Sequence, residues 1–268
     1  MVCCPGRAPA TRKPVGRAVF LTTLVLLAVP SAASAAFTGT VSGTSATLTG
    51  DGAADGLVLS VTGANLSHNL PGFDSPIDFD SAPGVQSIPA DDTAIVVVNA
   101  GDGADSVSAS GVPPTAIGSL TIDGQGGDDL LVGSQDADVL RGGDGNDRVG
   151  GGPGNDSVAG GAGNDTLVWN DGDGSDTMDG DLGNDEVEIN GAATAGDVFT
   201  ISQAGARQRV ERTNLAPSTL DLLAERITIN GRGGDDTITT TSTPFAQLTL
   251  NGGVGADTIT GGDGTDFI

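Results

Sequence analysis

The feature that most constrains the fold is a nine-residue phrase that occurs three times without a gap between residues 142 and 168. The three copies read GGDGNDRVG, GGPGNDSVA and GGAGNDTLV, so the repeat is G-G-x-G-x-D-x-U-x, in which U is apolar. A fixed period has to be identified before strands or helices are assigned, because it sets the whole architecture. One apolar side chain in nine residues cannot bury a core alone, so the copies must stack and share one.

Each place in the repeat has a physical role. Glycines at the first, second and fourth places allow positive φ and tight turning, so the loop can curl its main-chain carbonyls toward one point. The aspartate at the sixth place adds a charged oxygen, and an irregular oxygen-rich loop favours calcium over magnesium. The last three residues predict a short strand, whose middle side chain, Val149, Val158 or Leu167, points into the shared core.

These copies resemble the hemolysin-type (RTX) calcium-binding repeats, which share the same nonapeptide. The resemblance implies an all-β fold, a right-handed parallel β-roll or β-helix solenoid in which two nonapeptides form one turn. Calcium is then expected between loops that stack two repeats apart. On this basis Asp147 pairs with Asp165, and Asp138 pairs with Asp156 on the opposite edge.

The array extends beyond its regular centre. Five contiguous copies run from residue 124 to residue 168, and two more follow a two-residue insertion, Trp169 and Asn170, which we expect to form a bulge. Four stretches run from an alternating apolar strand into a repeat, which is typical of a coil of a solenoid; one leads into the first of the five copies, and three lie outside them. The sixth-place aspartates that we predict to bind calcium are Asp105, Asp129, Asp138, Asp147, Asp156, Asp165, Asp176, Asp185, Asp236, Asp257 and Asp266. The central loop glycines assigned to the same sites are Gly143, Gly145, Gly152, Gly154, Gly161 and Gly163.

Two copies depart from the consensus. Asp136 takes the fourth place of the second copy, where aspartate tolerates the left-handed conformation, so we expect a turn but the weakest site of the central five. The stretch GDGAADGLV holds Asp55 at the sixth place but lacks the turn glycine. It is either a worn repeat or an ordinary β-hairpin.

The first 36 residues have the pattern of a secretory signal peptide. A basic region precedes an apolar stretch of about 12 residues, shorter than the ~20 needed to span a bilayer, and small residues with an A-x-A site follow. We therefore expect cleavage after Ala35 or Ala36, secretion to the extracellular space and no direct membrane insertion. Cys3 and Cys4 both lie in this segment, so disulfides would contribute nothing to the mature chain.

The mature chain is strongly acidic. It keeps 7 basic and 35 acidic residues, a net charge of −28, which disfavours binding to nucleic acid or to anionic membranes. Such a charge is also typical of disordered or halophilic chains. Here the aspartates recur at one phase of a glycine repeat, which favours cation binding instead.

The remaining segments complete the predicted organisation. After the signal peptide we expect an irregular β-rich part over residues 37–98, the calcium-binding β-roll over 99–188, a calcium-free β-coil insert over 189–226 and a continued roll over 227–268. The last copy is interrupted at residue 268, which predicts a truncated array. In the insert, Arg207, Arg209 and Arg212 either offset neighbouring carboxylates, the interpretation we favour, or contact an anion or polysaccharide. His68 is expected to be structural, and Trp169 to cover an edge of the core.

The sequence thus predicts a secreted protein whose folding is coupled to extracellular calcium. It could alternatively be an adhesin, or an accessory region of a larger secreted enzyme such as a protease, lipase or polysaccharide-modifying enzyme. Neither H-E-x-x-H nor G-x-S-x-G occurs, and a single histidine leaves little room for a histidine-dependent triad, so we predict no enzymatic activity. The cell-surface or glycan partner of an adhesin is not identified by these residues.

Overall fold

The fold consists of two sheets of short strands that alternate along the chain. The computed structural model describes residues 37–268 except 71–72, 74, 80–83, 242–245 and 263–268. The predicted signal peptide and Asp266 therefore lie outside the described residues. Within these residues there is no helix, and so none long and apolar enough to cross a membrane. The all-β parallel roll predicted from the repeat is confirmed.

The larger sheet has twelve strands, and neighbours in the following order are hydrogen-bonded. They are β1 (Thr38–Ser42), β2 (Ser45–Thr49), β5 (Asp91–Asp102), β7 (Ile117–Gly126), β9 (Asp138–Asp144), β11 (Ser157–Gly163), β13 (Thr177–Gly183), β17 (Ser218–Leu223), β16 (Arg207–Arg212), β15 (Val198–Ala204), β19 (Thr237–Thr240) and β21 (Thr258–Thr260).

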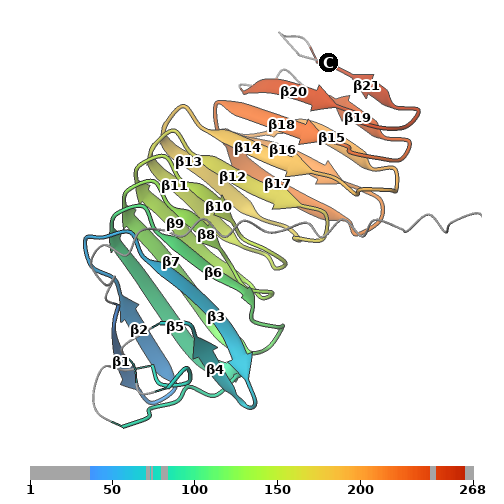
Figure 1. Cartoon of the computed structure of the whole chain (residues 1–268). Helices are drawn as coiled ribbons and strands as arrows, with labels where there is room; N and C mark the ends of the chain where they lie inside the picture. Colours follow the sequence, from blue (N-terminus) through green and yellow to red (C-terminus); the bar gives the residue numbers. More distant parts are fainter. Residues whose placement is uncertain (1–36, 71–72, 74, 80–83, 242–245, 263–268) are drawn as a thin grey trace, which may run out of the picture. The chain divides into compact units, whose positions relative to one another are not determined.

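The smaller sheet has nine strands in its own order. They are β20 (Gln247–Asn251), β18 (Arg226–Asn230), β14 (Glu186–Asn190), β12 (Thr166–Asn170), β10 (Arg148–Gly150), β8 (Leu130–Val132), β6 (Ser106–Gly111), β3 (Gly56–Thr62) and β4 (Asn65–His68). Figure 1 shows the strands of both sheets stacked side by side along the roll; their order follows the sequence except at β17, β16 and β15 of the larger sheet and at β3 and β4 of the smaller one.

Most neighbouring strands are parallel, because each coil adds one strand to each sheet. Val149 lies between Leu131 and Leu167 in this parallel register. The strands β2 and β3 of the N-terminal part pair in parallel with β5 and β6, so residues 45–62 join the same two sheets. The domain boundaries at residues 98, 188 and 226 stay predictions.

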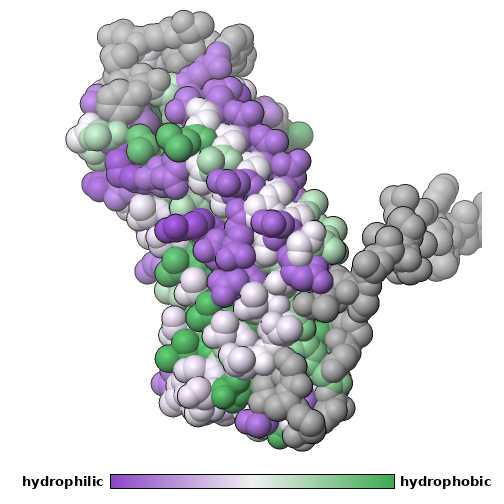
Figure 2. Space-filling view, turned by 90° about the vertical axis from the view of Figure 1, so that its left-hand side faces the viewer, coloured by the Kyte–Doolittle hydropathy of each residue, from purple (hydrophilic) through white to green (hydrophobic). Residues whose placement is uncertain are grey.

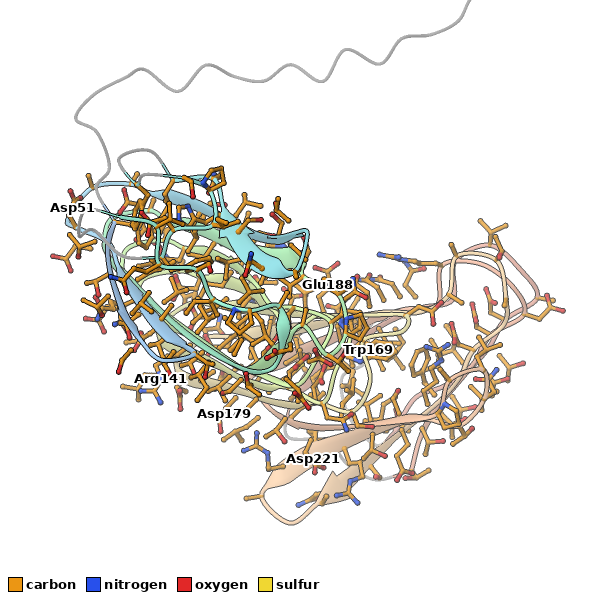
Figure 3. All side chains as sticks on the ribbon, turned by 90° about the horizontal axis from the view of Figure 1, so that it is seen from below. Asp51, Arg141, Trp169, Asp179, Glu188 and Asp221 are labelled. Atoms are coloured by element: carbon orange, nitrogen blue, oxygen red, sulfur yellow. The ribbon has the colours of Figure 1, made fainter. Side chains whose placement is uncertain are left out.

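The core consists of apolar side chains that point inward from both sheets. Val149, Val158 and Leu167 are at most 2% exposed, as predicted, and they belong to a buried cluster that continues through every coil. Trp169 is fully buried, and its indole N–H donates to the carbonyl of Gly174. Figure 3 shows Trp169 inside the roll, whereas Asp179 and Asp221 lie on its outer side.

The two-residue insertion at Trp169 and Asn170 does not form the expected bulge. It lengthens β12, which pairs with β14 over five residues without a shift in register, and the chain then turns between Asn170 and Asp173. The apolar Trp169 extends the inward row, so the insertion adds to the core and the stack is retained.

The segment after β14 departs most from a regular coil. Where other coils add one strand to the larger sheet, this one adds three, with β16 antiparallel to both β15 and β17. Its arginines contact carboxylates, as expected: Arg207 pairs with Asp179 and Arg209 with Asp221, each at 2.9 Å. The segment carries no glycine-aspartate loop between its strands.

A pair of leucines tests whether the inward row provides the stability of the roll. Leu167 is fully buried and Leu182, in the next coil of the larger sheet, is 74% exposed. We expect Leu167→Ala to lower the free energy of unfolding in calcium by about 2–5 kcal/mol, because it removes packed methylene groups and leaves a cavity. Leu182→Ala should change it by less than about 0.5 kcal/mol. Urea denaturation curves of the two variants measure the difference, and equal effects would contradict the described core.

Candidate calcium sites

The predicted aspartates lie at the two edges of the roll, where the chain passes from one sheet to the other. We call the edge whose loops lead into the nine-stranded sheet edge I, and the edge whose loops lead into the twelve-stranded sheet edge II. Asp147 precedes β10 and so lies on edge I, whereas Asp156 precedes β11 and lies on edge II. Figure 2 shows that hydrophilic residues cover much of one side of the stack.

On edge I the aspartates form a continuous hydrogen-bonded ladder. The main-chain N–H of Asp129 donates to Oδ1 of Asp147 at 2.8 Å, and that of Asp147 donates to Oδ1 of Asp165 at 2.8 Å. The same bond joins Asp55 to Asp105, Asp105 to Asp129, Asp165 to Asp185, and Asp185 to Oε2 of Glu225, at 2.6, 2.7, 2.9 and 2.8 Å. Asp105 and Asp129 are therefore neighbours despite their spacing of 24 residues.

On edge II the ladder occurs in two parts. In the first, the N–H of Asp138 donates to Asp156 and that of Asp156 to Asp176, both at 2.8 Å. The second joins Asp197 to Asp236 at 2.6 Å and Asp236 to Asp257 at 3.0 Å. The implied pairs of Asp147 with Asp165 and Asp138 with Asp156 are thus stacked neighbours, and so are Asp236 and Asp257.

The second carboxylate oxygen of most of these residues has no partner. Eight aspartates are buried, and their Oδ2 atoms are shielded from solvent and accept no hydrogen bond: Asp105, Asp129, Asp147, Asp156, Asp165, Asp176, Asp185 and Asp236. A buried carboxylate oxygen without a hydrogen-bond partner is costly, so a set of eight at equivalent places points to a missing cation.

Asp138 differs from the other aspartates. Its two oxygens accept hydrogen bonds from the main-chain N–H and the hydroxyl of Ser134, so neither is free. Asp136, in the same loop, does not have the left-handed backbone that we expected, and its carboxylate instead accepts a hydrogen bond from the N–H of Thr115. Both features agree with a weak site in this copy.

The loop glycines bring two oxygen types to one place. A Cβ added at Gly142 would lie 2.2 Å from Oδ2 of Asp147 and 2.4 Å from the carbonyl oxygen of Gly160. Glycine is therefore required at first places such as Gly142 because no side chain fits between the main chain and these oxygens. The positive φ that we predicted there does not occur. Positive φ occurs at Gly143, Gly145, Gly152, Gly161 and Gly163, but not at Gly154. At Gly154 an added Cβ would lie 2.6 Å from the carbonyl oxygen of Asp136, so close approach again explains the glycine.

These donors fit calcium. They are all oxygens, part carboxylate and part main-chain carbonyl, and their arrangement in flexible glycine loops suits a cation that accepts irregular coordination. Among the described residues no cluster of three or more Asp, Glu, His or Cys side chains could hold a metal. A calcium ion here would therefore take at most two carboxylates from neighbouring loops and its other ligands from carbonyl oxygens or water.

Burial changes the acidity of both ladders. It raises the pKa of Asp129, Asp147 and Asp165 to about 6, and those of Asp105 and Asp138 to the same value. The pKa of Asp176 rises to about 7 and that of Asp156 to about 8, again chiefly because of burial, with neighbouring carboxylates adding to it. Hydrogen bonds from main-chain N–H groups oppose these shifts. Without a cation, the folded chain therefore holds protons on groups that are ionised in the unfolded chain.

Three acidic residues of the ladders were not among the predicted sites. Asp55 starts the edge I ladder, so the worn repeat GDGAADGLV is part of the array and not an isolated hairpin. Asp197 and Glu225 occupy ladder places 39 and 40 residues from their partners. An acidic residue followed by an alternating apolar strand, DVFTI and ERITI, is the signal that they share with the regular copies.

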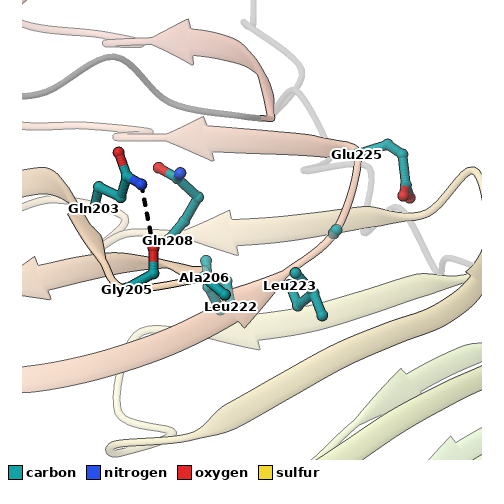
Figure 4. Close-up of a pocket in the computed structure, with 8 residues that line it drawn as sticks. Gln203, Gly205, Ala206, Gln208, Leu222, Leu223 and Glu225 are labelled. Atoms are coloured by element: carbon teal, nitrogen blue, oxygen red, sulfur yellow. Dashed lines mark hydrogen bonds between the residues drawn. The ribbon is translucent and has the colours of Figure 1, made fainter.

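Two features besides the predicted sites are the only histidine of the sequence, His68, and a cavity beside β15, β16 and β17. His68 is buried, and its Nε2 contacts the carbonyl oxygen of Asp78 while Nδ1 accepts the N–H of Leu70, so it has a structural role. The cavity has a volume of about 470 Å³ and lies between the β15–β16 turn and the end of β17. Figure 4 shows its lining, in which Glu225 is the only ionisable side chain among the described residues.

The fold and the ladders define a parallel β-roll with carboxylate-bearing loops along both edges. The family model of the RTX calcium-binding nonapeptide repeat matches residues 123–158, 132–167, 150–187, 228–242 and 249–268. The matched residues are hemolysin-type RTX repeats, and calcium is the cation that such repeats bind. The family is a structural calcium-binding repeat and is typically found in secreted proteins. No curated protein matches the chain.

The raised pKa values predict an unusual pH dependence for the metal-free chain. Between about pH 4 and pH 8 the folded chain binds more protons than the unfolded one, so stability falls as the pH rises through this window. In chelator we expect more β-structure at about pH 5 than at about pH 8, as measured by far-ultraviolet circular dichroism. Saturating calcium should remove this loss at the higher pH. A metal-free chain that gains structure as the pH rises would contradict the buried ladders.

Proposed function

We propose that the protein is secreted and that calcium binding by its two aspartate ladders completes folding outside the cell. The carrying observation is the set of eight buried aspartate oxygens without partners, all at the same place of a stacked loop. Each pair of neighbouring loops offers carboxylate and carbonyl oxygens to one small space, as at Gly142. This is the donor set of a calcium site.

The residues proposed to hold calcium are those of the ladders. On edge I they are Asp55, Asp105, Asp129, Asp147, Asp165 and Asp185, with Glu225 at the end. On edge II they are Asp138, Asp156, Asp176, Asp236 and Asp257. Asp266 is proposed from its sequence alone.

Repulsion and chain entropy explain why folding would wait for calcium. Stacked carboxylates repel one another when no cation lies between them, and glycine-rich loops lose much conformational freedom on ordering. Extracellular modules bind calcium with dissociation constants of about 10⁻⁴ to 10⁻³ M. At millimolar calcium each independent site then adds roughly 0.4 to 1.4 kcal/mol by mass action. Several sites coupled through the stack decide between the unfolded and the folded chain.

The proposed route agrees with this switch. A chain with the signal-peptide pattern of residues 1–36 would cross the membrane in an unfolded form while calcium is scarce. It would become rigid where calcium is plentiful.

A matched pair of aspartates in one loop tests this function. Asp147 is buried in the ladder, whereas Asp144, three residues earlier, is exposed. We expect Asp147→Asn to lower the calcium stoichiometry in isothermal titration calorimetry and to shift the folding midpoint to higher calcium. Asp144→Asn should leave both unchanged, although it removes the same charge. The triple variant Asp147→Asn, Asp156→Asn, Asp165→Asn should lose most of the response.

Two results would contradict the proposed function. A wild-type chain that is fully β-structured in chelator, and whose circular dichroism does not respond to millimolar calcium, would exclude the folding switch. Calcium stoichiometry that is equal in the Asp147→Asn and Asp144→Asn chains would exclude the assigned ladder. Magnesium in place of calcium serves as the control for general charge screening.

A further inference from the structure

The ladder on edge II is interrupted between Asp176 and Asp197, where strands β17 and β16 separate β13 from β15. The loop before Asp197 stacks on the loop of Asp236 on one side, but no calcium loop lies on its other side, toward Asp176. Arg212, the last residue of β16, reaches into the interruption, and its side chain is 1% exposed. A guanidinium so deeply buried requires compensation for its lost hydration.

Two carboxylates compensate the charge of Arg212. Its Nε lies 2.9 Å from Oδ1 of Asp197, whose side chain is fully buried, and its Nη2 lies 2.7 Å from Oδ1 of Asp171. These contacts lack the direction of hydrogen bonds, so they are ion pairs. The guanidinium carbon also lies 5.6 Å from the ring centre of Trp169, within reach of a cation–π interaction.

The loop of Asp197 has the geometry of the proposed calcium loops. A Cβ added at Gly191 would lie 2.3 Å from Oδ2 of Asp197 and 3.1 Å from the carbonyl oxygen of Gly231. The N–H of Asp197 donates to the next aspartate, as does that of Asp147. The loop differs at both carboxylate oxygens. Oδ1, which elsewhere accepts the N–H of the preceding ladder residue, here faces Arg212, and Oδ2, which is unpartnered in the eight calcium loops, accepts the N–H of Ala192 at 2.7 Å.

We propose that Arg212 is a permanent cation that takes the place of calcium at the interruption of edge II. It lets the segment around Trp169, Asp171 and Asp197 fold without calcium, and it links Asp197 to Asp171, which lies in the loop before Asp176. The inference rests on the proposed calcium-coupled folding of the other coils. Arginine suits this role because it stays protonated at every physiological pH.

The consequence is an order of assembly. The loops on either side of the insert carry carboxylates that wait for calcium, whereas the carboxylates at the insert already have their counter-ion. In low calcium the segment around Arg212 is therefore structured first, and it presents β17 and β15 as edges on which β13 and β19 of the flanking coils stack as calcium rises.

The single tryptophan of the chain reports on this segment directly. In the wild-type chain in chelator, we expect Trp169 fluorescence to be blue-shifted and protected from acrylamide, while the far-ultraviolet circular dichroism shows little β-structure. Calcium should then change the dichroism strongly and the fluorescence little. Trp169 fluorescence that follows calcium with the same midpoint as the dichroism would overturn the inference about Arg212. A dichroism signal without any calcium response would instead overturn the proposed function.

Two variants on the same strand add a matched comparison. Arg212→Met keeps the length of the side chain and removes its charge, so Trp169 in chelator should show the red-shifted, readily quenched emission of an exposed indole. Arg209→Met removes an outer ion pair with Asp221 and should leave Trp169 protected. Arg212→Lys, which retains a charge, should restore part of the protection. Equal Trp169 emission in the Arg212→Met and Arg209→Met chains would also overturn the inference.

Discussion

The structure depends on one repeated interaction, the hydrogen bond from the main-chain N–H of one ladder aspartate to Oδ1 of the next. This bond fixes each carboxylate at the start of its strand and aligns successive coils. It also leaves Oδ2 buried beside the carbonyl oxygens of the glycine loop. The aspartate carboxylate therefore has two effects. Its Oδ1 aligns the coils by accepting the ladder hydrogen bond, and its buried Oδ2 requires a cation to compensate its charge.

The remaining features serve this interaction. A single apolar residue per repeat, such as Val149, supplies a narrow core, and glycines allow the loops of successive coils to approach closely. Where the stack of calcium loops is interrupted, at the three antiparallel strands between Asp197 and Glu225, other groups take over. Arginines pair with carboxylates there, and Trp169 fills the interior beside Arg212.

The sequence was sufficient for the fold and the ladder where the spacing is regular. Two nine-residue repeats form one turn, so the spacing of 18 residues places Asp147 and Asp165 in neighbouring coils. The parallel register of β10 and β12 retains this spacing. Asp197 and Glu225 could not be placed, because their positions depend on how three antiparallel strands insert into the larger sheet. The antiparallel pairing is set by tertiary contacts and the turn at Gly205, for which the repeat offers no period.

The backbone at the second place of the repeat could not be predicted from residue type alone. Gln125, Asp181 and Arg232 have positive φ there, although the pattern has glycine at this place.

The central claim is that the unpartnered Oδ2 atoms of the ladders are calcium ligands. A crystal structure of the calcium-bound chain, with anomalous differences collected where calcium scatters strongly, tests it most directly. We expect anomalous difference peaks at about 2.3–2.6 Å from Oδ2 of Asp147 and of Asp165, and none beside the guanidinium of Arg212. The same folded coils without any peak at these carboxylates would contradict it.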